Sequence, residues 1–317
     1  MPKKWVFRTN LLRSIGVNKK IFTFAFYFCI KIKMKIITTQ SAVIEEINSI
    51  KKENKTIGFV PTMGALHRGH LSLIKKAAAE NDVCVVSIFV NPTQFNNSDD
   101  LKNYPRTLEK DCQMIENEDC TLVFAPSNED IYTKNETEKT FEFDFQGLDK
   151  VMEGLFRQNH FNGVVQIVSK LFELIKPNRA YFGEKDFQQL AIIRLMTREL
   201  SFPVEIVGCP IIREKSGLAM SSRNELLTEN ERVIAAHIYA VLKESTIFAF
   251  ETSVSELKSA VIAAINQKPE LEVEYFEIVD GKTLKSIENW EETDYVIGCV
   301  ATYCGKIRLI DNICYKK

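Results

Sequence analysis

Apolar and polar residues follow two rhythms between residues 55 and 210. Short apolar runs, typical of buried strands, lie at 57–60, 83–90, 121–125, 180–182 and 204–207. Between them, apolar residues recur with the spacing of one helix face at 71–80, 108–118, 161–175 and 188–200. Strands that alternate with helices of this length favour βαβ units, so this region is predicted to be α/β, built on a parallel sheet.

The order of elements changes after Pro210. Two helical segments, at 229–248 and 254–268, precede three strand-like runs at 273–279, 295–303 and 306–310. Helices followed by strands favour a separate α+β unit over further βαβ units. We therefore expect one domain at residues 34–210 and a smaller α+β C-terminal domain at 211–317, with the boundary near residues 208–211.

Composition and charge narrow the class of protein. The chain has 317 residues, of which 45% are hydrophobic and 26% charged, a balance that excludes disordered and collagen-like chains. Residues 1–33 hold eight of the 41 Lys and Arg residues and no acid, so the remainder carries 33 basic against 42 acidic residues, or −9. A body this acidic matches the phosphates of a nucleic acid poorly, and we expect no nucleic-acid partner.

Residues 1–33 match no complete targeting signal. The apolar run at 21–30 falls short of the ~20 residues needed to cross a bilayer. Lys31 and Lys33 follow it, where a secretory peptide would have small residues and a cleavage site. A mitochondrial transit peptide stays open as an alternative, because acids are absent. We expect a non-native or dispensable extension, such as a mis-called start, and no membrane partner.

The eight cysteines are scattered and form no C-x-x-C pair. In a chain with this much core they are predicted to be reduced and buried, which favours a cytoplasmic protein over a disulfide framework. The closest pair, Cys299 and Cys304, has no second pair at zinc-ligand spacing. No metal bound directly by the protein is therefore expected.

The first candidate chemical motif spans residues 61–70, which read PTMGALHRGH after the first predicted strand. His67 and His70 are three residues apart, so on a helix they would lie one turn apart on one face. Gly64 and Gly69 have no Cβ and let a ligand approach the backbone. A helix N-terminus already favours phosphate, so two imidazoles there indicate contacts with a triphosphate. Two structural histidines in a turn are the alternative, and a metal site lacks an evident third ligand.

A second motif, LAMSSRN at residues 218–224, places two hydroxyls and a guanidinium in a row. Ser221, Ser222 and Arg223 in this order suit a phosphate clamp, since both hydroxyl and guanidinium groups donate hydrogen bonds. The alternative is a helix cap ahead of Leu226 with a solvated arginine.

A third motif, FGEKDFQQ at residues 182–189, again lies where a predicted strand enters a helix. Gly183 and Lys185 suit a phosphate, Asp186 suits Mg²⁺ or a ribose, and Gln189 suits a substrate oxygen. A charged loop that caps the helix is the alternative. Residues 91–95, NPTQF, follow the second strand and offer neutral amides to hydroxyl or carboxylate groups.

All but the second of these motifs lie at carboxyl ends of predicted parallel strands, the edge where open α/β sheets bind ligands. The chain has no G-x-x-x-x-G-K-[ST], G-x-G-x-x-G or G-x-S-x-G motif. P-loop hydrolysis, dinucleotide hydride transfer and serine-hydrolase chemistry are therefore poorly supported.

The His-x-Gly-His junction at residues 67–70 resembles the nucleotidyltransferase superfamily, and the whole set of motifs resembles the pantothenate synthetase (pantoate–beta-alanine ligase) family. The resemblance runs from about Met34 to Cys314 and rests on residues 61–70, 91–95, 104–106, 154–157, 160–164, 182–189, 217–224 and 308–312. It implies a Rossmann-like, parallel-sheet nucleotidyltransferase domain at 34–210 and a small α+β domain at 211–317 that closes the site.

The resemblance also implies a reaction and its residues. Pantoate and ATP would give a bound pantoyl adenylate and pyrophosphate, and beta-alanine would then displace AMP to give pantothenate, on the route to coenzyme A. Mg²⁺ would accompany ATP, and the enzyme would be a homodimer. The implied catalytic residues are His70 as proton donor, His67 and Lys185, and Gln94 would bind pantoate and beta-alanine while Gln189 binds pantoate. The implied ATP-binding residues are Met63, Gly64, Ala65, Leu66, His67, Arg68, Gly69, His70, Gly183, Glu184, Lys185, Asp186, Ile212, Met220, Ser221, Ser222 and Arg223.

Two departures and two rival functions accompany this interpretation. Gln158 stands where the family usually has proline, and Gln166-Ile167 replaces its usual Thr-Val, changes that bear on the shape of the substrate pocket. The rivals are another adenylating or nucleotidyl-transferring enzyme of the superfamily and a catalytically silent nucleotide-binding module. Gln94 and Gln189 argue against the first rival, and the intact set of charged motif residues argues against the second.

Overall fold

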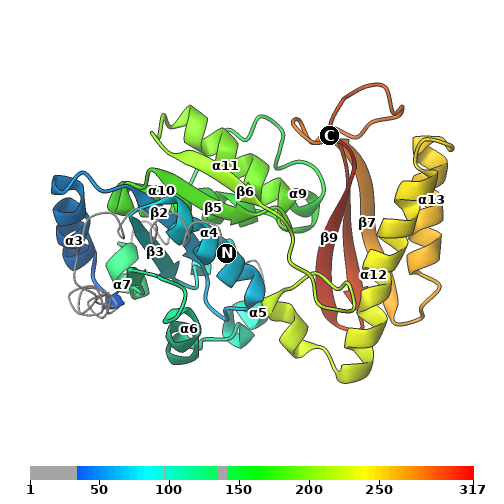
Figure 1. The fold of residues 1–317 in the computed structure, drawn as a ribbon. Coiled ribbons are helices and arrows are strands. Elements are labelled where there is room, and N and C mark those ends of the chain that lie inside the picture. The colour runs from blue at the N-terminus through cyan, green and yellow to red at the C-terminus, as the bar shows by residue number, and fades with distance from the viewer. Residues whose placement is uncertain (1–33, 96–97, 134–140) are drawn as a thin grey trace, which may run out of the picture. The chain divides into compact units, whose positions relative to one another are not determined.

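The computed structural model describes residues 34–95, 98–133 and 141–317. Residues 1–33, predicted to be a dispensable extension, lie outside the described residues. Figure 1 shows the arrangement of the elements, which in chain order are β1 (Lys35–Ile37), α3 (Gln40–Lys52), β2 (Ile57–Thr62), α4 (Arg68–Glu80), β3 (Val83–Ile88), η1 (Pro92–Gln94), α5 (Ser98–Asn103), α6 (Leu108–Ile115), β4 (Leu122–Phe124), α7 (Asn128–Ile131), α9 (Glu153–Phe156), α10 (His160–Ile175), β5 (Arg179–Gly183), α11 (Phe187–Glu199), β6 (Glu205–Cys209), η2 (Ser222–Leu226), α12 (Glu229–Phe248), α13 (Val254–Ile265), β7 (Leu271–Asp280), β8 (Val296–Cys304) and β9 (Ile307–Lys316).

The larger sheet has six strands in the order β1-β4-β3-β2-β5-β6, and every neighbouring pair is parallel. After β1 at one edge of the sheet, the chain forms β2 near the centre and adds β3 and β4 on one side of it. The chain then returns and adds β5 and β6 on the other side of β2. The order therefore reverses beside β2, and the carboxyl ends of β2, β3 and β5 meet at this switch point. The prediction of an α/β domain with a parallel sheet is confirmed.

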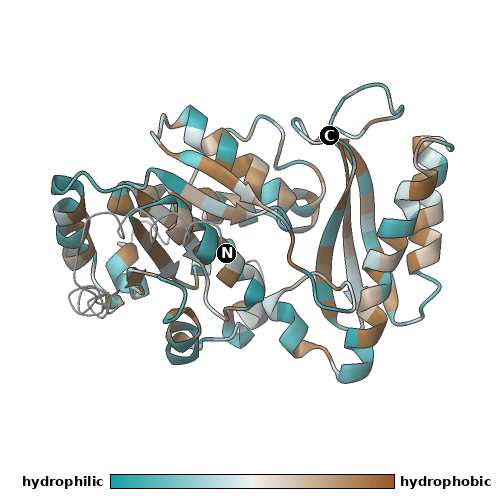
Figure 2. Cartoon of the chain, viewed as in Figure 1, coloured by the Kyte–Doolittle hydropathy of each residue, from teal (hydrophilic) through white to brown (hydrophobic). Residues whose placement is uncertain are grey.

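Side chains of the central strands alternate between two apolar cores, as the period of a strand requires. Phe59 and Val85 face a core shared with α3, α10 and α11, whereas Val60 and Val86 face a core shared with α4 and α6. Both faces of the sheet are thus covered, and in Figure 2 the strands between the helices are mostly brown while the outer helix faces are teal. Coverage on both faces explains why these strands appear in the sequence as continuous apolar runs.

The smaller sheet is antiparallel, with the order β7-β8-β9. Helices α12 and α13 cover one face and share a core with it. Each helix begins with a capping box, Thr228 with Glu231 and Ser253 with Glu256, which fixes where the helix starts. The helices-then-strands order predicted for the C-terminal part is confirmed.

Several boundaries differ from the sequence prediction. Strand β1 and helix α3 were not predicted, and β9 continues to Lys316 rather than ending at residue 310. Helix α4 starts at Arg68, with His67 as its N-cap, because both histidine rings satisfy free backbone N–H groups of the first turn.

The prediction that the cysteines are buried is wrong for one of the seven in the described residues. All seven are free, and Cys314 near the C-terminal end of β9 is exposed while the others are buried. A strand at the edge of a sheet presents part of its length to solvent, which explains this exposure. In the described part of the chain, no helix has both the length and the apolar character to cross a membrane.

Candidate active site

A cavity of about 230 Å³ opens at the carboxyl ends of β2, β3 and β5. Three of the four sequence motifs, at residues 61–70, 91–95 and 182–189, follow these strands and contribute to its wall, and the fourth, at 218–224, reaches it from the connection to the C-terminal helices. Of the residues implied by the family resemblance, those that line it are Met63, His67, Gly69, His70, Gln94, Gly183, Lys185, Asp186, Gln189, Ile212, Met220, Ser221, Ser222 and Arg223.

Five of the implied residues lie outside this lining: Gly64, Ala65, Leu66, Arg68 and Glu184. Ala65 and Leu66 are buried, and Arg68 is exposed. Of the departures from the family pattern, Gln158 and Gln166 also lie outside the lining, whereas Ile167 contributes an apolar wall.

The two histidines are held by the start of α4. His67 Nδ1 accepts a hydrogen bond from the Gly69 N–H at 3.1 Å, and His70 Nδ1 accepts one from the His67 N–H at 3.3 Å. Their ring centroids are 4.1 Å apart. Because Nδ1 is an acceptor in both rings, the proton of each neutral imidazole lies on Nε2. The structural alternative and the functional prediction are therefore compatible, since capping uses one nitrogen and leaves the other to donate.

Both rings are neutral at pH 7. Burial, followed by the positive charge of Lys185, lowers the pKa of His67 to about 4. Burial also holds the pKa of His70 well below its ordinary value, and His67 and Lys185 lower it further. Two neutral Nε2–H donors beside a lysine make a site for an anion that needs no counter-charge on the histidines.

Asp111 supports the loop before the histidines, a role that sequence reasoning missed. Its side chain is buried, and its two carboxylate oxygens accept hydrogen bonds from the N–H groups of Ala65 at 3.0 Å and Leu66 at 2.7 Å. The Thr107 hydroxyl donates to the same carboxylate at 3.2 Å. Gly64 and Ala65 both have positive φ, of 79° and 48°, a turn that Asp111 stabilises by satisfying its amides.

The other residues predicted to bind phosphate border the same cavity. An added Cβ at Gly183 would meet no atom within 4 Å, so the backbone here borders open space. The Lys185 ammonium lies 3.9 Å from the Asp186 carboxylate. Ser221 Oγ accepts a hydrogen bond from the Arg223 N–H at 3.2 Å and caps η2, so the capping alternative holds for this serine while its side chain still borders the cavity.

Gln94 comes from η1, directly after β3, and is buried. Its Nε2 donates to Met63 Sδ at 2.7 Å, and its Oε1 accepts from Asn91 Nδ2 at 3.2 Å. Gln189 lies on the first turn of α11 and borders the same cavity. The two amides thus line the same cavity as the histidines and Lys185.

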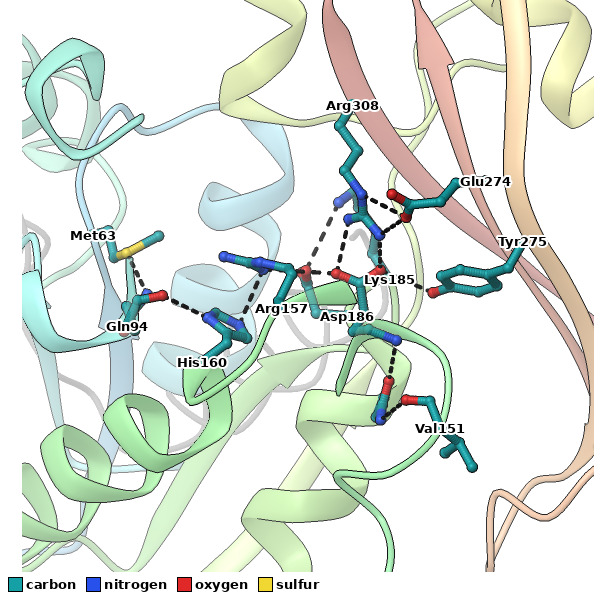
Figure 3. Close-up of polar contacts among 12 residues, drawn as sticks. Met63, Gln94, Val151, Arg157, His160, Lys185, Asp186, Glu274, Tyr275 and Arg308 are labelled. Atoms are coloured by element: carbon teal, nitrogen blue, oxygen red, sulfur yellow. Dashed lines mark hydrogen bonds and ion pairs between the residues drawn. The ribbon is translucent and has the colours of Figure 1, made fainter. Parts of the chain in front are cut away.

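A smaller hollow of about 90 Å³ adjoins the cavity and shares Gln94, Lys185 and Arg223 with it. Glu153 and Arg157 contribute to its lining and belong to an ion-pair cluster drawn in Figure 3. Arg308 donates to both oxygens of Glu153, at 2.7 and 2.9 Å, and to Glu274 at 2.5 Å. Arg157 lies 3.7 Å from the same Glu153 carboxylate.

Strand β9 makes two more contacts near the site. Arg213 donates to both oxygens of Asp311, at 2.6 and 3.0 Å. Asn312 Nδ2 donates to the backbone carbonyls of Glu184 at 2.8 Å and Lys185 at 3.0 Å. The motif at residues 308–312 therefore connects the antiparallel sheet, through hydrogen bonds, to the segment that carries Lys185.

Across the described ranges, no three or more His, Cys, Asp or Glu side chains gather in a way that could hold a metal ion. Asp186 is the one carboxylate among the described residues that line the larger cavity. A metal ion in this cavity would accordingly take most of its ligands from a bound anion.

Neutral imidazoles at a helix start, a lysine, paired serines and an arginine at the switch point of a parallel sheet define a nucleotide-binding α/β protein. The sequence model of the family described as Pantoate-beta-alanine ligase matches residues 35–314. The chain therefore belongs to the pantoate–beta-alanine ligase family of enzymes.

Individual relatives agree over nearly their whole length. The pantothenate synthetase of Phocaeicola vulgatus is 56% identical over 284 residues, which cover 89% of this chain and 100% of that protein. Its Bacteroides fragilis counterpart is 55% identical, with 90% and 100% covered. The pantothenate synthetase structure from Thermus thermophilus has a TM-score of 0.83 and 39% identity, covering 90% of this chain and 100% of that one. The Francisella tularensis ligase, described as complexed with beta-gamma ATP and beta-alanine, has a TM-score of 0.74 and 37% identity, covering 89% and 98%.

Proposed function

We propose that this chain condenses pantoate with beta-alanine, using ATP, through a pantoyl-adenylate intermediate. The observation that carries the proposal is that Gln94 and Gln189 share one cavity with the two histidines and Lys185. The amides suit the hydroxyl and carboxylate groups of a small hydroxy acid, and the cationic and Nε2–H groups suit a triphosphate. Membership of the pantoate–beta-alanine ligase family supports the same reaction.

The first step is an in-line displacement at phosphorus. A carboxylate oxygen of pantoate attacks the α-phosphorus of ATP, the bond from that phosphorus to the oxygen bridging the β-phosphate breaks, and pyrophosphate leaves. Negative charge builds on the phosphates, where His67, His70 and Lys185 can stabilise it. Among the residues implied for ATP, Gly183, Ser222 and Arg223 would hold the rest of the nucleotide in this position.

The second step forms the amide. The amine nitrogen of beta-alanine attacks the pantoyl carbonyl, the carbon–oxygen bond to AMP breaks, and the amine loses a proton. Gln94 borders both the cavity and the smaller hollow, so it can contact pantoate and the incoming amine. No covalent enzyme intermediate is needed, and the protein acts by positioning and charge stabilisation.

Mg²⁺ enters as part of the Mg–ATP substrate. The donor set fits this role, because Asp186 alone among the described lining residues offers a carboxylate and the ion would take its other ligands from the triphosphate and water. The ion would neutralise the charge of the phosphates during adenylation.

The proposed function is tested by exchange of labelled pyrophosphate into ATP. We expect exchange with pantoate alone, no exchange without it, and formation of AMP and pantothenate only when beta-alanine is added. A matched control is 3,3-dimethylbutanoate, which keeps the carboxylate and the methyl groups but lacks both hydroxyls, and should support little exchange because the buried amides lose their partners. Exchange that ignores pantoate would overturn the substrate assignment.

Three further proposals concern the whole chain. The domain boundary near residue 210 is supported by the end of β6 at Cys209, after which no strand joins the parallel sheet within the described residues. A cytoplasmic location is supported by the seven free cysteines of the described residues. The homodimer is implied by the family resemblance, and light scattering of the purified chain measures it.

A further inference from the structure

His160, the first residue of α10, lies behind Gln94 and is buried. Its Nδ1 is 2.8 Å from the backbone oxygen of Gln94, and its Nε2 is 3.1 Å from Arg157 Nη1. A guanidinium can only donate, so Nε2 must accept and the ring proton lies on Nδ1, from which it is donated to the Gln94 carbonyl. Burial, followed by the charge of Arg157, lowers the pKa of His160 to about 3, so the ring is neutral at ordinary pH.

This proton position sets His160 apart from the other three histidines of the chain. His67 and His70 accept at Nδ1 and carry their proton on Nε2. His237 Nε2 lies 3.0 Å from the Ala264 carbonyl, which also requires a proton on Nε2. Arg157 is what makes His160 different, because it occupies the nitrogen that carries the proton in the others.

The amide of Gln94 is oriented from a second direction. The Tyr132 hydroxyl donates to Asn91 Oδ1 at 2.8 Å, which fixes the Asn91 amide so that its Nδ2 donates to Gln94 Oε1. The same Nδ2 donates to the Gly163 carbonyl of α10 at 2.9 Å. With its oxygen taken by Asn91, Gln94 presents its NH₂ group toward Met63 and the cavity.

Arg157 is itself held in place by Glu153, which Arg308 and the Tyr275 hydroxyl also contact, at 2.7 and 2.9 Å. Figure 3 shows the resulting series of contacts, from Gln94 through His160 and Arg157 to Arg308 on the antiparallel sheet. Each member between Gln94 and Arg308 is buried or half-buried. The backbone oxygen of Gln94 is therefore held by His160, which Arg157 in turn holds in place.

We propose that His160 is a positioning residue that aims the Gln94 amide at the acyl substrate, with Arg157 fixing the proton of His160 on Nδ1. This inference rests on the proposed function, because it takes Gln94 to bind pantoate. It predicts that removal of the His160 side chain weakens the binding of pantoate but not of ATP. The reason is that His160 contacts η1, and no described hydrogen bond links it to the segment at 182–189 or to the start of α4.

The test compares His160→Asn with His160→Leu. The amide nitrogen of asparagine is bonded to Cγ as Nδ1 is, so His160→Asn can still donate to the Gln94 carbonyl, whereas His160→Leu cannot. We expect His160→Leu to raise the KM for pantoate about tenfold in pyrophosphate exchange, the size of one lost hydrogen bond, and to leave the KM for ATP within about twofold. His160→Asn should recover most of the pantoate affinity. Thermal unfolding of both variants shows whether either has lost the fold.

A second readout does not depend on turnover. In ¹⁵N spectra of histidine-labelled enzyme, protonated and bare ring nitrogens have well-separated shifts, and the resonances lost in His160→Asn belong to His160. We expect His160 in the Nδ1–H form and the other three histidines in the Nε2–H form.

Each outcome has a distinct meaning. His160 in the Nε2–H form, an unchanged pantoate KM in a folded His160→Leu variant, or equal losses in the asparagine and leucine variants would each overturn the positioning role. A wild-type enzyme without pantoate-dependent exchange would overturn the proposed function itself, and the ¹⁵N spectra would still decide the proton position.

Discussion

His70 is a capping residue at the start of α4, and we propose that its second ring nitrogen also acts in adenylation. Its Nδ1 accepts the His67 N–H, and its low pKa keeps the ring neutral, so Nε2–H is a fixed donor at the cavity wall. In adenylation, charge builds on the α-phosphate and on the departing pyrophosphate, which such a donor stabilises. In amide formation the acyl group is already activated. His70→Ala should therefore slow pantoate-dependent exchange by ~10²–10³, as for one lost transition-state donor.

The half-reactions separate this role from simple positioning. Conversion of supplied pantoyl adenylate by beta-alanine should fall much less than exchange in His70→Ala, and nucleotide affinity should change little. His70→Gln, which can place an amide N–H near the position of Nε2, is the matched control and should regain part of the exchange rate. Equal losses in both half-reactions would make His70 a general positioning residue, and no loss in either would leave it a helix cap.

Residues in local motifs could be predicted from the sequence, and residues that act across the chain could not. His67, Gln94 and Lys185 lie in short runs at strand ends, so topology alone brings them to one edge of the sheet. Arg223 lies in a local motif of the connection to the C-terminal helices. Asp111 is 45 and 46 residues from the amides it binds, and it is one of four acids in the predicted helix at 108–118, so no sequence pattern indicates its partners. The roles of the implied residues toward ligands stay predictions.

At the scale of elements, buried strands were predictable from continuous apolar runs, and long amphipathic helices from apolar residues at helical spacing. Strand β1 pairs only with β4 among the described strands and has three residues. Its apolar run is too short to be predicted as a strand. Helix α3 buries Val43, Ile47 and Ile50, whose spacing is that of one helix face. This pattern is present in the sequence, but the helix was not predicted from it. The start of α4 was misplaced because an imidazole is an unusual N-cap.

The contact of α10 with η1 gives a prediction at this scale. A Cβ on Gly163 would lie 2.5 Å from the Thr93 carbonyl carbon and 2.6 Å from the Gln94 nitrogen, both backbone atoms with little freedom to move. Gly163→Ala should therefore push η1 away from α10, raise the KM for pantoate, and lower the free energy of unfolding by about 1–3 kcal/mol.

Gly183→Ala is the control for the added methyl group, measured by unfolding alone. A Cβ there meets no atom within 4 Å, so its free energy of unfolding should stay within about 0.5 kcal/mol of wild type. If Gly163→Ala were as stable and bound pantoate as well as the wild type, close packing of α10 on η1 would not be what holds Gln94.

At the scale of the whole molecule, β9 joins the two sheets through side chains that sequence patterns did not assign to partners. One of these contacts is the Glu153–Arg308 ion pair with the parallel-sheet region, whose side chains are 10% and 18% exposed. Burial would raise the pKa of Glu153, but hydrogen bonds and charge from Arg308 and the charge of Arg157 outweigh it and bring the pKa to about 2. A folded-state pKa that far below the unfolded value near 4.5 means that ionised Glu153 stabilises the fold.

A double-mutant cycle with Glu153→Gln and Arg308→Met, followed by urea unfolding, measures this contribution. At pH 7 each single variant should lose about 1.5–3 kcal/mol, because it takes one charged partner from a buried group, while Glu274 still pairs with Arg308 and Arg157 still pairs with Glu153. The double variant should lose less than the sum. A depressed carboxyl pKa gives stability that is full above the unfolded value and is lost as pH falls toward 2, so the difference between wild type and Glu153→Gln should shrink by roughly half at pH 3. The Arg179–Glu205 pair, 38% and 63% exposed, is the matched control and should couple by only about 0–1 kcal/mol at either pH. Coupling in the buried pair that is equally small, or that is unchanged between pH 7 and pH 3, would mean that this ion pair does not hold the two sheets together, and that the apolar cluster containing Met152, Phe187 and Ile297 does so instead.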